Sequence, residues 1–355
     1  MDDTRALRTE AVPGRPVTDP ACWTADELAA RADDWILALS EAEISHLEGM
    51  ATAIQARIGD DPNGLLALSR DDFDLGPFAA TVDRALEILK DGVGLALIRG
   101  LPVARWGKLA SAIVYWAMGR HIGLAQPNNP QGDMFGHIAD MGRDYDNPLH
   151  RGYQTNVTMA FHVDPPDVLT LLCLQTAKSG GRSSLVSSVL LHNEMLARRP
   201  DLVEELGYAF YRSRHGEMGP GQAPYYRAAV FDFPDGMLSV SAGAKHVEKG
   251  HALPEAPDLT ATQKEALKMF ADIAQEIAFE TDLQAGDIPL LNSHVTLHTR
   301  NAFEDFPERE RRRHLWRLWL RVDGFRPRSA YFENWVDGVW APEAARNITL
   351  EAWPA

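Results

Sequence analysis

The stretch MAFHVDPPD, residues 159–167, places a histidine and a carboxylate two positions apart, at His162 and Asp164. Alternate side chains of a β-strand point to the same face, so a strand here would present both groups together. The solvated face of an ordinary antiparallel strand would explain the pair equally well. The pair alone therefore leaves open whether this face carries a metal.

A second pair of histidines stands far along the chain in LLNSHVTLHTR, at His294 and His298. Their spacing suits one face of a strand and nearly one face of a helix, and such pairs are more often structural than metal-binding. No glutamate follows the first histidine, as a zinc protease motif would require. Taken with His162 and Asp164, however, they offer the two-histidine, one-carboxylate set of non-haem Fe(II) oxygenases, which leaves metal positions open for cosubstrate and oxygen.

Arginines recur every four residues downstream, where RHLWRLWLR carries Arg313, Arg317 and Arg321 among leucines and tryptophans. In a strand, these three side chains would share a face with Leu315 and Trp319. An arginine in apolar surroundings needs an anion, and a guanidinium clamps a carboxylate through two parallel hydrogen bonds. A dicarboxylate bound beside an iron site would need such a clamp.

Together these motifs resemble the taurine dioxygenase family of Fe(II)- and 2-oxoglutarate-dependent oxygenases, within the clavaminate synthase-like group. The resemblance covers most of residues 90–325. It rests on FHVDPPDVLTLLCLQTAKSGGRSSLVSS, LQAGDIPLLNSHVTLHTRNAFEDFPERERRRHLWRLWL and GVGLALIRGLP. The family pattern implies that His162, Asp164 and His298 are the iron ligands. It favours His298 over His294, because the final histidine of the family directly precedes the stretch that reads TRNAFEDFP here.

The same resemblance implies the cosubstrate site. Arg313 falls where the family binds the distal carboxylate of 2-oxoglutarate, and Arg317 where it contacts the other carboxylate or the substrate. Ser183 follows Gly180-Gly181 at a position where the family usually has a threonine that supports 2-oxoglutarate. The expected enzyme uses Fe(II), 2-oxoglutarate and O₂, hydroxylates an unactivated C–H bond of a small organic molecule, and releases succinate and CO₂. Desaturation and cyclisation stay open as outcomes.

Substrate residues are predicted on weaker grounds. A strand is predicted over roughly residues 153–164, and in it Asn156 shares the face of His162. Residues 123–152 read as a long loop, which we interpret as a lid, with His137 and Tyr145 lining it. Arg317 or Arg321 could receive an anionic substrate. For the loop residues, ordinary contact with water is an equally good explanation.

The remaining elements predict a mixed α/β protein with a β core. Short strands over the C-terminal two thirds suggest a β-sandwich or jelly roll, and the resemblance implies a double-stranded β-helix flanked by helices. Residues 1–20 are polar and proline-rich and predict a loosely held arm; residues 21–355 predict one domain with its core at about 90–325. Helical periodicity extends over residues 23–57, 78–92, 106–118 and 260–280, the last with a capping box at Thr262 and Glu265.

Composition limits the partners. The 355 residues carry a net charge of −15, which argues against nucleic acid or an anionic membrane as the main partner. The N-terminus lacks the apolar core of a signal peptide, and the two cysteines, Cys22 and Cys173, fit a reducing cytoplasm. The oligomeric state is not readable.

The same motifs are compatible with two functions other than an oxygenase. One is a jelly-roll metal- or small-ligand-binding module without redox chemistry, which would have no need of the clamp at Arg313. The other is a zinc hydrolase, for which the sequence shows no well-placed glutamate beside the three ligands.

Overall fold

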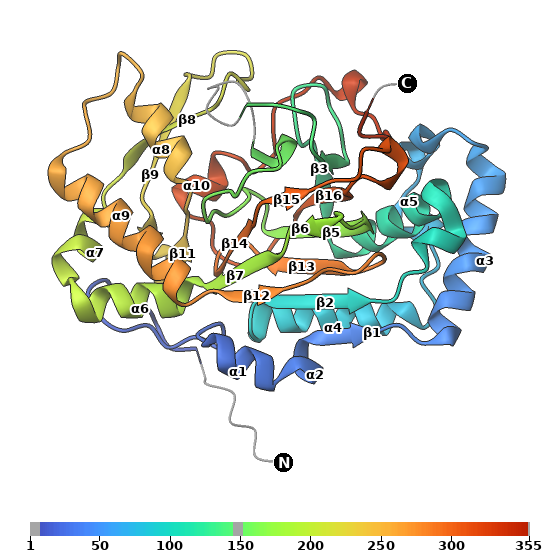
Figure 1. Ribbon diagram of the computed structural model, residues 1–355, viewed down its shortest axis with the longest axis horizontal. Helices are drawn as coiled ribbons and strands as arrows, with labels where there is room; N and C mark the ends of the chain where they lie inside the picture. The colour runs from blue at the N-terminus through green and yellow to red at the C-terminus, as the bar shows by residue number, and fades with distance from the viewer. Residues whose placement is uncertain (1–7, 145–151, 354–355) are drawn as a thin grey trace.

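The computed structural model describes residues 8–144 and 152–353. The chain forms a mixed α/β structure in which β-sheets occupy the centre and helices lie outside them (Figure 1). Within the described residues the largest sheet has seven strands, in the order β1-β2-β13-β5-β16-β3, and β4 also pairs with β16. Its strands are β1 (Ile36–Ala38), β2 (Leu95–Arg99), β3 (Leu124–Gln126), β4 (Gly136–Ile138), β5 (Val168–Gln175), β13 (Ile288–Asn292) and β16 (His314–Arg321).

The middle of this sheet is formed by the most apolar runs of the chain. β5 reads VLTLLCLQ and β16 reads HLWRLWLR, and the two strands run antiparallel with Trp316 opposite Leu172 and Leu318 opposite Thr170. Trp316 and Leu318 are fully buried. Apolar strands of this kind are stable only where both faces are covered, so helices must pack on the sheet.

A second, three-stranded sheet has the order β12-β7-β14 and is antiparallel throughout. Three two-stranded pairs make up the remaining strands of the described residues. The elements are β7 (Ser183–Ser187), β12 (Phe279–Thr281), β14 (Thr296–Arg300), β6 (Ser179–Gly180) with β15 (Phe303–Glu304), β8 (Phe210–Ser213) with β9 (Tyr225–Ala228), and β10 (Phe231–Asp232) with β11 (Ser239–Val240).

The turn between β6 and β7 requires glycine. Gly180 and Gly181 have φ angles of 72° and 76°, a region that L side chains rarely adopt. A Cβ at Gly180 would lie 2.4 Å from the carbonyl oxygen of Ala302. The Gly-Gly pair of the sequence therefore allows β6 to approach β15 and then redirects the chain into β7.

Helices cover the sheets in two groups. α3 and α5 pack against each other on one side, α4 packs along β2, and α6, α7 and α9 form a cluster at the opposite end (Figure 1). The helices are α1 (Ala25–Ala30), α2 (Ala32–Trp35), α3 (Glu41–Ile58), α4 (Phe78–Asp91), α5 (Val103–Ile122), α6 (Ser188–Arg198), α7 (Pro200–Leu206), α8 (Ala244–His251), α9 (Ala261–Glu276) and α10 (Ala330–Glu333). Short 3₁₀ turns lie at Pro62–Ala67, Arg70–Asp72, Gly152–Gln154, Pro234–Gly236, Arg309–Arg311 and Glu343–Ala345.

The predicted strand over residues 153–164 is wrong. A 3₁₀ turn covers Gly152–Gln154, and the chain then stays irregular, with a single β-bridge residue at His162. The reason is that side chains satisfy its carbonyls: the Arg300 guanidinium donates to Thr155 and Val157, and the Thr299 hydroxyl to Met159. A neighbouring strand is therefore not needed to pair them.

Three other predicted segments are corrected. The helical stretch at 23–57 is interrupted by β1, which pairs in parallel with β2. The stretch 123–152, predicted as a loop, contains β3 and β4, because both pair with β16. The capping box of α9 uses Thr260 and Gln263 instead of Thr262 and Glu265.

The described part of the N-terminal arm, residues 8–20, is anchored to the domain. The amide of Ala11 donates to the Gly236 carbonyl at 2.7 Å, and the amide of Val17 donates to Asn193 Oδ1 at 2.8 Å. Ala11 and Val17 are both buried in the core. The expected loose arm is thus wrong for these residues.

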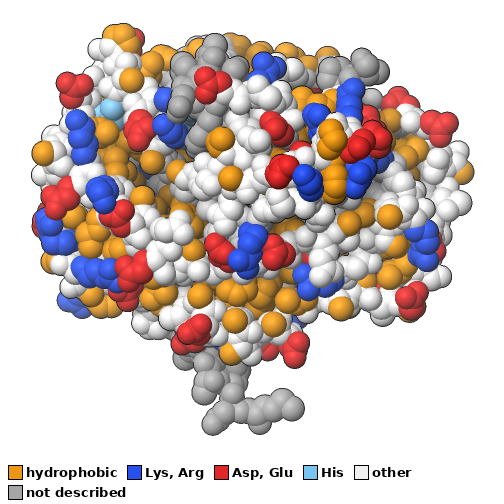
Figure 2. All heavy atoms as spheres, viewed as in Figure 1, with side chains coloured by type: hydrophobic (Ala, Val, Ile, Leu, Met, Phe, Trp, Pro, Cys, Tyr) orange, Lys and Arg blue, Asp and Glu red, His pale blue; other side chains and the backbone are white. Residues whose placement is uncertain are grey.

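The surface is mixed in charge on the face shown in Figure 2, where acidic and basic side chains alternate with apolar ones among the described residues. Within the same part of the chain, no helix has the length and apolar character needed to cross a membrane.

Candidate metal centre and cavity

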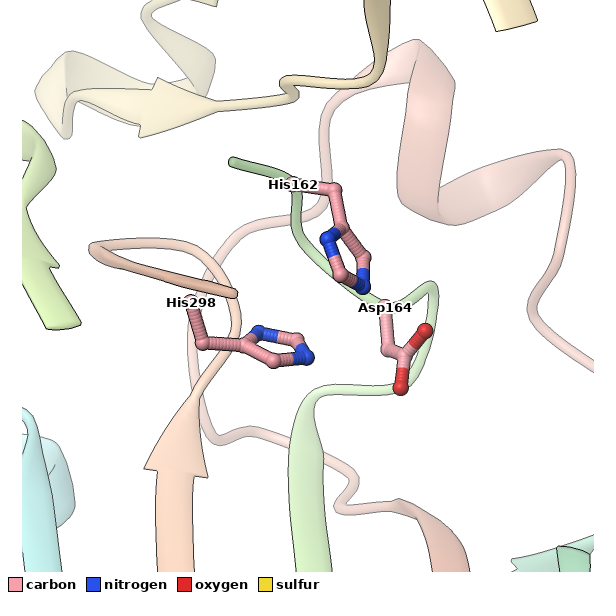
Figure 3. Close-up of side chains that lie close together, drawn as sticks. All are labelled: His162, Asp164 and His298. Carbon is pink, nitrogen blue, oxygen red and sulfur yellow. The ribbon is translucent and has the colours of Figure 1, made fainter. Parts of the chain in front are cut away.

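Three side chains from distant parts of the sequence converge at one point. His162, Asp164 and His298 each offer a ligand atom, and these atoms lie within 4.8 Å of one another. Figure 3 shows the three side chains directed towards a common space, two from the segment before β5 and one from β14. The structure therefore brings together the set that the sequence singled out.

Backbone hydrogen bonds fix the separation of the two histidines. His162 N donates to the His298 carbonyl at 3.1 Å, and His298 N donates to the His162 carbonyl at 2.9 Å. His162 also forms a β-bridge with Gly243, and the amide of Val163 donates to the Ala242 carbonyl at 3.4 Å. The first ligand is thus held between β14 and the residues that precede α8.

Both imidazoles are prepared for a metal. His162 Nδ1 lies 2.9 Å from the Ala160 carbonyl, a contact that keeps the proton on Nδ1 and leaves the Nε2 lone pair available. Burial, with a smaller contribution from the neighbouring His162, lowers the pKa of His298 to about 3 against the opposing effect of Asp164. Metal binding requires neutral histidine, so no proton has to leave His298 at neutral pH.

Asp164 is ionised and oriented. Only 7% of it is exposed, and burial alone would raise the pKa of its carboxyl. The Arg317 guanidinium, 3.2 Å away, and the two histidines outweigh burial and lower that pKa. Trp319 Nε1 donates to the same carboxylate oxygen at 3.2 Å. Two imidazoles and one carboxylate with ligand atoms within 4.8 Å of one another fit the facial triad of a non-haem iron site.

The three residues lie in the wall of a cavity of about 140 Å³. The large sheet contributes Leu171, Arg317 and Trp319 to this wall, and the three-stranded sheet contributes Ser183 and His298. The cavity therefore lies between the two sheets, next to the candidate metal ligands.

Arg313 also lines the cavity, and its charge is not neutralised. It is 5% exposed, and its Nη1 is fully buried without a hydrogen-bond partner among the described residues. The guanidinium lies over the Phe303 ring, 5.2 Å from the centroid, and against Gly181. Burial lowers the pKa of Arg313, although Cys173 and Asp305 oppose this. A buried guanidinium with an unused donor is suited to a ligand carboxylate.

Arg317 is committed to the metal ligand in this structure. Besides Asp164 it donates to Asn128 Oδ1 at 2.8 Å, and its guanidinium lies between the rings of Tyr153 and Trp319, at 4.7 and 4.4 Å. It lines the cavity, as does Ser183 at the start of β7.

Of the residues nominated for the substrate, Arg317 lines the cavity, but Asn156 and His137 do not. Asn156 is exposed, and its carbonyl accepts from the Phe303 amide. His137 Nδ1 lies 2.9 Å from His314 Nε2, and its Nε2 lies 2.8 Å from the Thr349 hydroxyl. Asn156 and His137 therefore lie outside the described cavity wall.

Arg321 and Tyr145 are the other two residues nominated for the substrate site. Arg321 pairs with Asp337 at 2.8 Å and with Asp323 at 3.4 Å. It is not part of the described cavity wall, because it lies at the opposite end of β16 from Arg313. Tyr145 lies outside the described residues.

His294, the histidine that the sequence disfavoured, has a structural environment. It is fully buried, its Nε2 lies 3.1 Å from Asp167 Oδ1, and its ring stacks on Phe332 at 3.9 Å. Asp167 also accepts from Arg328 at 2.6 Å. This network attaches the C-terminal segment to the start of β5.

Sequence reasoning missed the basic residues of the cavity wall. Lys245, His246 and Lys249 of α8 line it, together with His215 after β8. The signal was present in AKHVEKGH, a basic helix in an acidic chain. Nothing local in that helix indicated that it faces a site assembled from other strands.

The chain matches the model of a known family, described as taurine catabolism dioxygenase TauD, TfdA family, over residues 62–319. It therefore belongs to this family of dioxygenases, as the sequence motifs indicated. It is 30% identical over 332 residues to the FR-33289 synthase of Streptomyces rubellomurinus, covering 90% of this chain and 95% of that protein. It is 28% identical over 315 residues to the taurine hydroxylase-like protein SAT17 of Stachybotrys chartarum, covering 85% and 79%.

Solved structures share the fold. An asparagine oxygenase in complex with Fe(II), 3-hydroxyasparagine and succinate superposes with a TM-score of 0.64 at 17% identity, covering 81% of this chain and 94% of that one. The non-haem iron oxygenase OrfP, in complex with Fe and α-ketoglutaric acid, superposes with a TM-score of 0.60 at 14% identity over the same shares.

Proposed function

We propose that this protein is an Fe(II)- and 2-oxoglutarate-dependent dioxygenase that hydroxylates a C–H bond of a small organic molecule. The observation that carries the proposal is the coincidence of two features in one cavity. A two-histidine, one-carboxylate set stands in its wall, and so does the guanidinium of Arg313, whose Nη1 is buried without a hydrogen-bond partner among the described residues. A non-redox binding module has no need of the second feature. The Fe(II) and succinate in the asparagine oxygenase structure, and the iron and α-ketoglutaric acid in the OrfP structure, support the same cofactors here.

We assign the core to a double-stranded β-helix. β5, β13 and β16 would form one of its sheets, and β7 and β14 the other. The position of the cavity between these two sheets supports this assignment. On the same basis, we treat residues 21–355 as one oxygenase domain with its core at about 90–325.

The chain's own residues would hold and orient the reactants. His162, Asp164 and His298 hold the metal, Arg313 pairs with the distal carboxylate of 2-oxoglutarate, and the Ser183 hydroxyl donates to the cosubstrate. Bound iron, with 2-oxoglutarate and O₂, supplies the oxidant for the C–H bond and releases succinate and CO₂.

Arg317 acts on the same site through Asp164. The Arg317 guanidinium and the Trp319 indole fix the Asp164 carboxylate, so that it can ligate without reorganisation. The apolar part of the wall, including Leu171 and Phe161, excludes water from the reacting atoms.

The test is anaerobic. Metal-free protein receives Fe(II) and then 2-oxoglutarate, and the visible charge-transfer absorption is recorded for the wild type and for His162→Ala. His46→Ala, which removes a histidine of α3 outside the cavity, serves as the control. A band in the wild type and control that is missing in His162→Ala supports the proposal. If folded wild-type protein shows no band, the oxygenase function is rejected in favour of a non-redox metal module.

A further inference from the structure

A second, smaller cavity lies beside the metal cavity, and we call it the apolar cavity. Its volume is about 40 Å³, against about 140 Å³ for the metal cavity. It is bounded by α8, by α9, and by the segments that precede His162 and α8. Every described side chain of its wall is apolar, and the largest belong to Phe161, Leu267 and Phe270. The wall therefore has no side chain that can hold a charged or hydrogen-bonding ligand.

Backbone carbonyls in the wall of the apolar cavity are already paired. The Ala160 carbonyl lies 2.9 Å from His162 Nδ1, and the Gly243 carbonyl accepts from the Val247 amide at 3.2 Å. A buried water molecule needs two to four polar partners, and a cavity lined by apolar side chains stays dry and binds apolar guests such as xenon. We therefore expect the apolar cavity to take a small apolar molecule in preference to water.

One end of the apolar cavity adjoins the metal cavity. Four residues belong to the walls of both cavities: Ala160, Phe161, Gly243 and Ala244. Phe161 directly precedes the metal ligand His162, and Gly243 forms the β-bridge with that ligand. The two cavities are thus separated by the residues that hold His162 in place.

The other end of the apolar cavity reaches the surface of the protein at α9. Ala271 of α9 belongs to the wall and is exposed, and Leu267, one helical turn earlier, is half-buried. Val230, Val247 and Phe270 form the interior part of the wall and are buried. The apolar cavity therefore extends from the exterior at α9 towards the candidate metal centre.

The reactants of the proposed function differ in polarity. 2-Oxoglutarate is a dianion and is assigned above to the metal cavity, where Arg313 lines the wall. O₂ is small, uncharged and apolar, so it loses little when it leaves water for an apolar cavity. Once 2-oxoglutarate and a substrate occupy the metal cavity of about 140 Å³, O₂ needs access from another side. The apolar cavity has the size, the polarity and the position for this.

We propose that the apolar cavity is a site for O₂ on its way from the surface at α9 to the metal centre. This inference rests on the proposed function and adds the route of its gaseous cosubstrate. O₂ enters beside Ala271, occupies the space next to Val247 and Phe270, and reaches the metal cavity past Phe161. A larger side chain at Ala271 or at Val247 should therefore obstruct the route without touching a metal ligand or Arg313.

The experiment has two measurements on the anaerobic protein loaded with Fe(II) and 2-oxoglutarate, after the charge-transfer band has shown that this complex forms. Crystals under xenon pressure report whether the apolar cavity binds a gas. Stopped-flow absorption with nitric oxide, a diatomic gas that binds Fe(II) as O₂ does, gives the association and dissociation rate constants at the iron. The variants are Ala271→Phe and Val247→Ile. Ala261→Phe, at an exposed alanine of α9 outside both cavities, is the matched control.

We expect xenon between α8 and α9 in the wild type and in Ala261→Phe, and much weaker xenon density in Val247→Ile. In Ala271→Phe and Val247→Ile the association rate constant of nitric oxide should fall about 5-fold or more. The dissociation rate constant should fall by the same factor, because an obstructed route slows both directions and leaves the Kd unchanged.

Three results would overturn the inference. The first is a wild type that binds no xenon in the apolar cavity, and the second is an association rate constant in both variants equal to that of Ala261→Phe. The third is a slower association without an equally slower dissociation, which would mean that the substitutions alter the iron site itself. Because the charge-transfer band is recorded first, each of these results leaves the oxygenase function standing.

Discussion

Arg313 allows a prediction in which stability and ligand binding change in opposite directions. Its guanidinium is buried with no hydrogen-bonded anion among the described residues, and burying such a charge opposes folding. Arg313→Met keeps the length and apolar contacts of the side chain and removes that charge. Without ligand, we therefore expect the variant to be as stable as the wild type or more stable.

The affinity for 2-oxoglutarate should fall steeply in the same variant. Removing one partner of a buried, hydrogen-bonded charge pair costs about 2–5 kcal/mol. At about 1.4 kcal/mol per tenfold, the Kd should rise between about 30-fold and a few thousandfold. At a 2-oxoglutarate concentration of about 100 times the wild-type Kd, the wild type gains about 2.7 kcal/mol of stability. A variant with a Kd about 100-fold higher gains only about 0.4 kcal/mol.

The assay is urea unfolding under anaerobic conditions with Fe(II), with and without 2-oxoglutarate. Arg321→Met is the control, because Arg321 is an arginine of the same strand that pairs with Asp337 outside the cavity. The reasoning fails if Arg313→Met retains the full stabilisation by 2-oxoglutarate. It also fails if the ligand-free variant loses more than about 2 kcal/mol, since the guanidinium would then be a structural element.

Three further predictions concern the ligand-free protein. Asp164→Asn should lower the free energy of unfolding by about 3–5 kcal/mol, because it leaves Arg317 buried without its carboxylate. Adding Arg317→Met should restore much of the lost stability; equal stability of the single and double variants in urea would contradict this reasoning. Burial lowers the pKa of His314 from 6.5 to about 2, so below pH 6.5 the unfolded chain binds a proton that the folded chain does not. Stability should therefore fall as the pH decreases, by about 2 kcal/mol at pH 5 from this residue, and His314→Gln should show a shallower pH dependence of the melting temperature. Gly180→Ala should cost at least about 1 kcal/mol more than Gly14→Ala in thermal unfolding, because both glycines have positive φ but only Gly180 would contact a backbone oxygen.

The sequence was most informative where a motif has few alternatives. Residue types indicate a two-histidine, one-carboxylate set, the resemblance to the taurine dioxygenase family selects His162, Asp164 and His298, and the structure places these three together. The apolar surroundings of Arg313, Arg317 and Arg321 indicate a need for an anion, and the resemblance implies that Arg313 is the one that binds 2-oxoglutarate. The apolar runs at β5 and β16 lie at the centre of the large sheet, because long apolar segments have few other places in a folded domain.

Local sequence patterns gave wrong predictions for segments whose structure depends on contacts with residues far away in the sequence. Residues 153–164 alternate as a strand does, but the Arg300 side chain takes the carbonyls that a neighbouring strand would otherwise pair. Asn156 was nominated because a strand would place it on the same face as His162. The segment is not a strand, and Asn156 is exposed. The capping box of α9 shifted by two residues because Thr260 and Gln263 offer the same chemistry as Thr262 and Glu265. The basic face of α8 became meaningful only when the fold placed it in the cavity wall.

The β-bridge between His162 and Gly243 has a thermodynamic consequence. One backbone contact joins the first metal ligand to the residue from which α8 begins, so neither can shift without moving the other. If metal binding changes the affinity of the cavity for a ligand that contacts α8, that ligand changes the affinity for the metal by the same factor. Metal binding and ligand binding beside α8 would then be coupled. Their separately measured binding free energies would not add up to the binding free energy of the full complex.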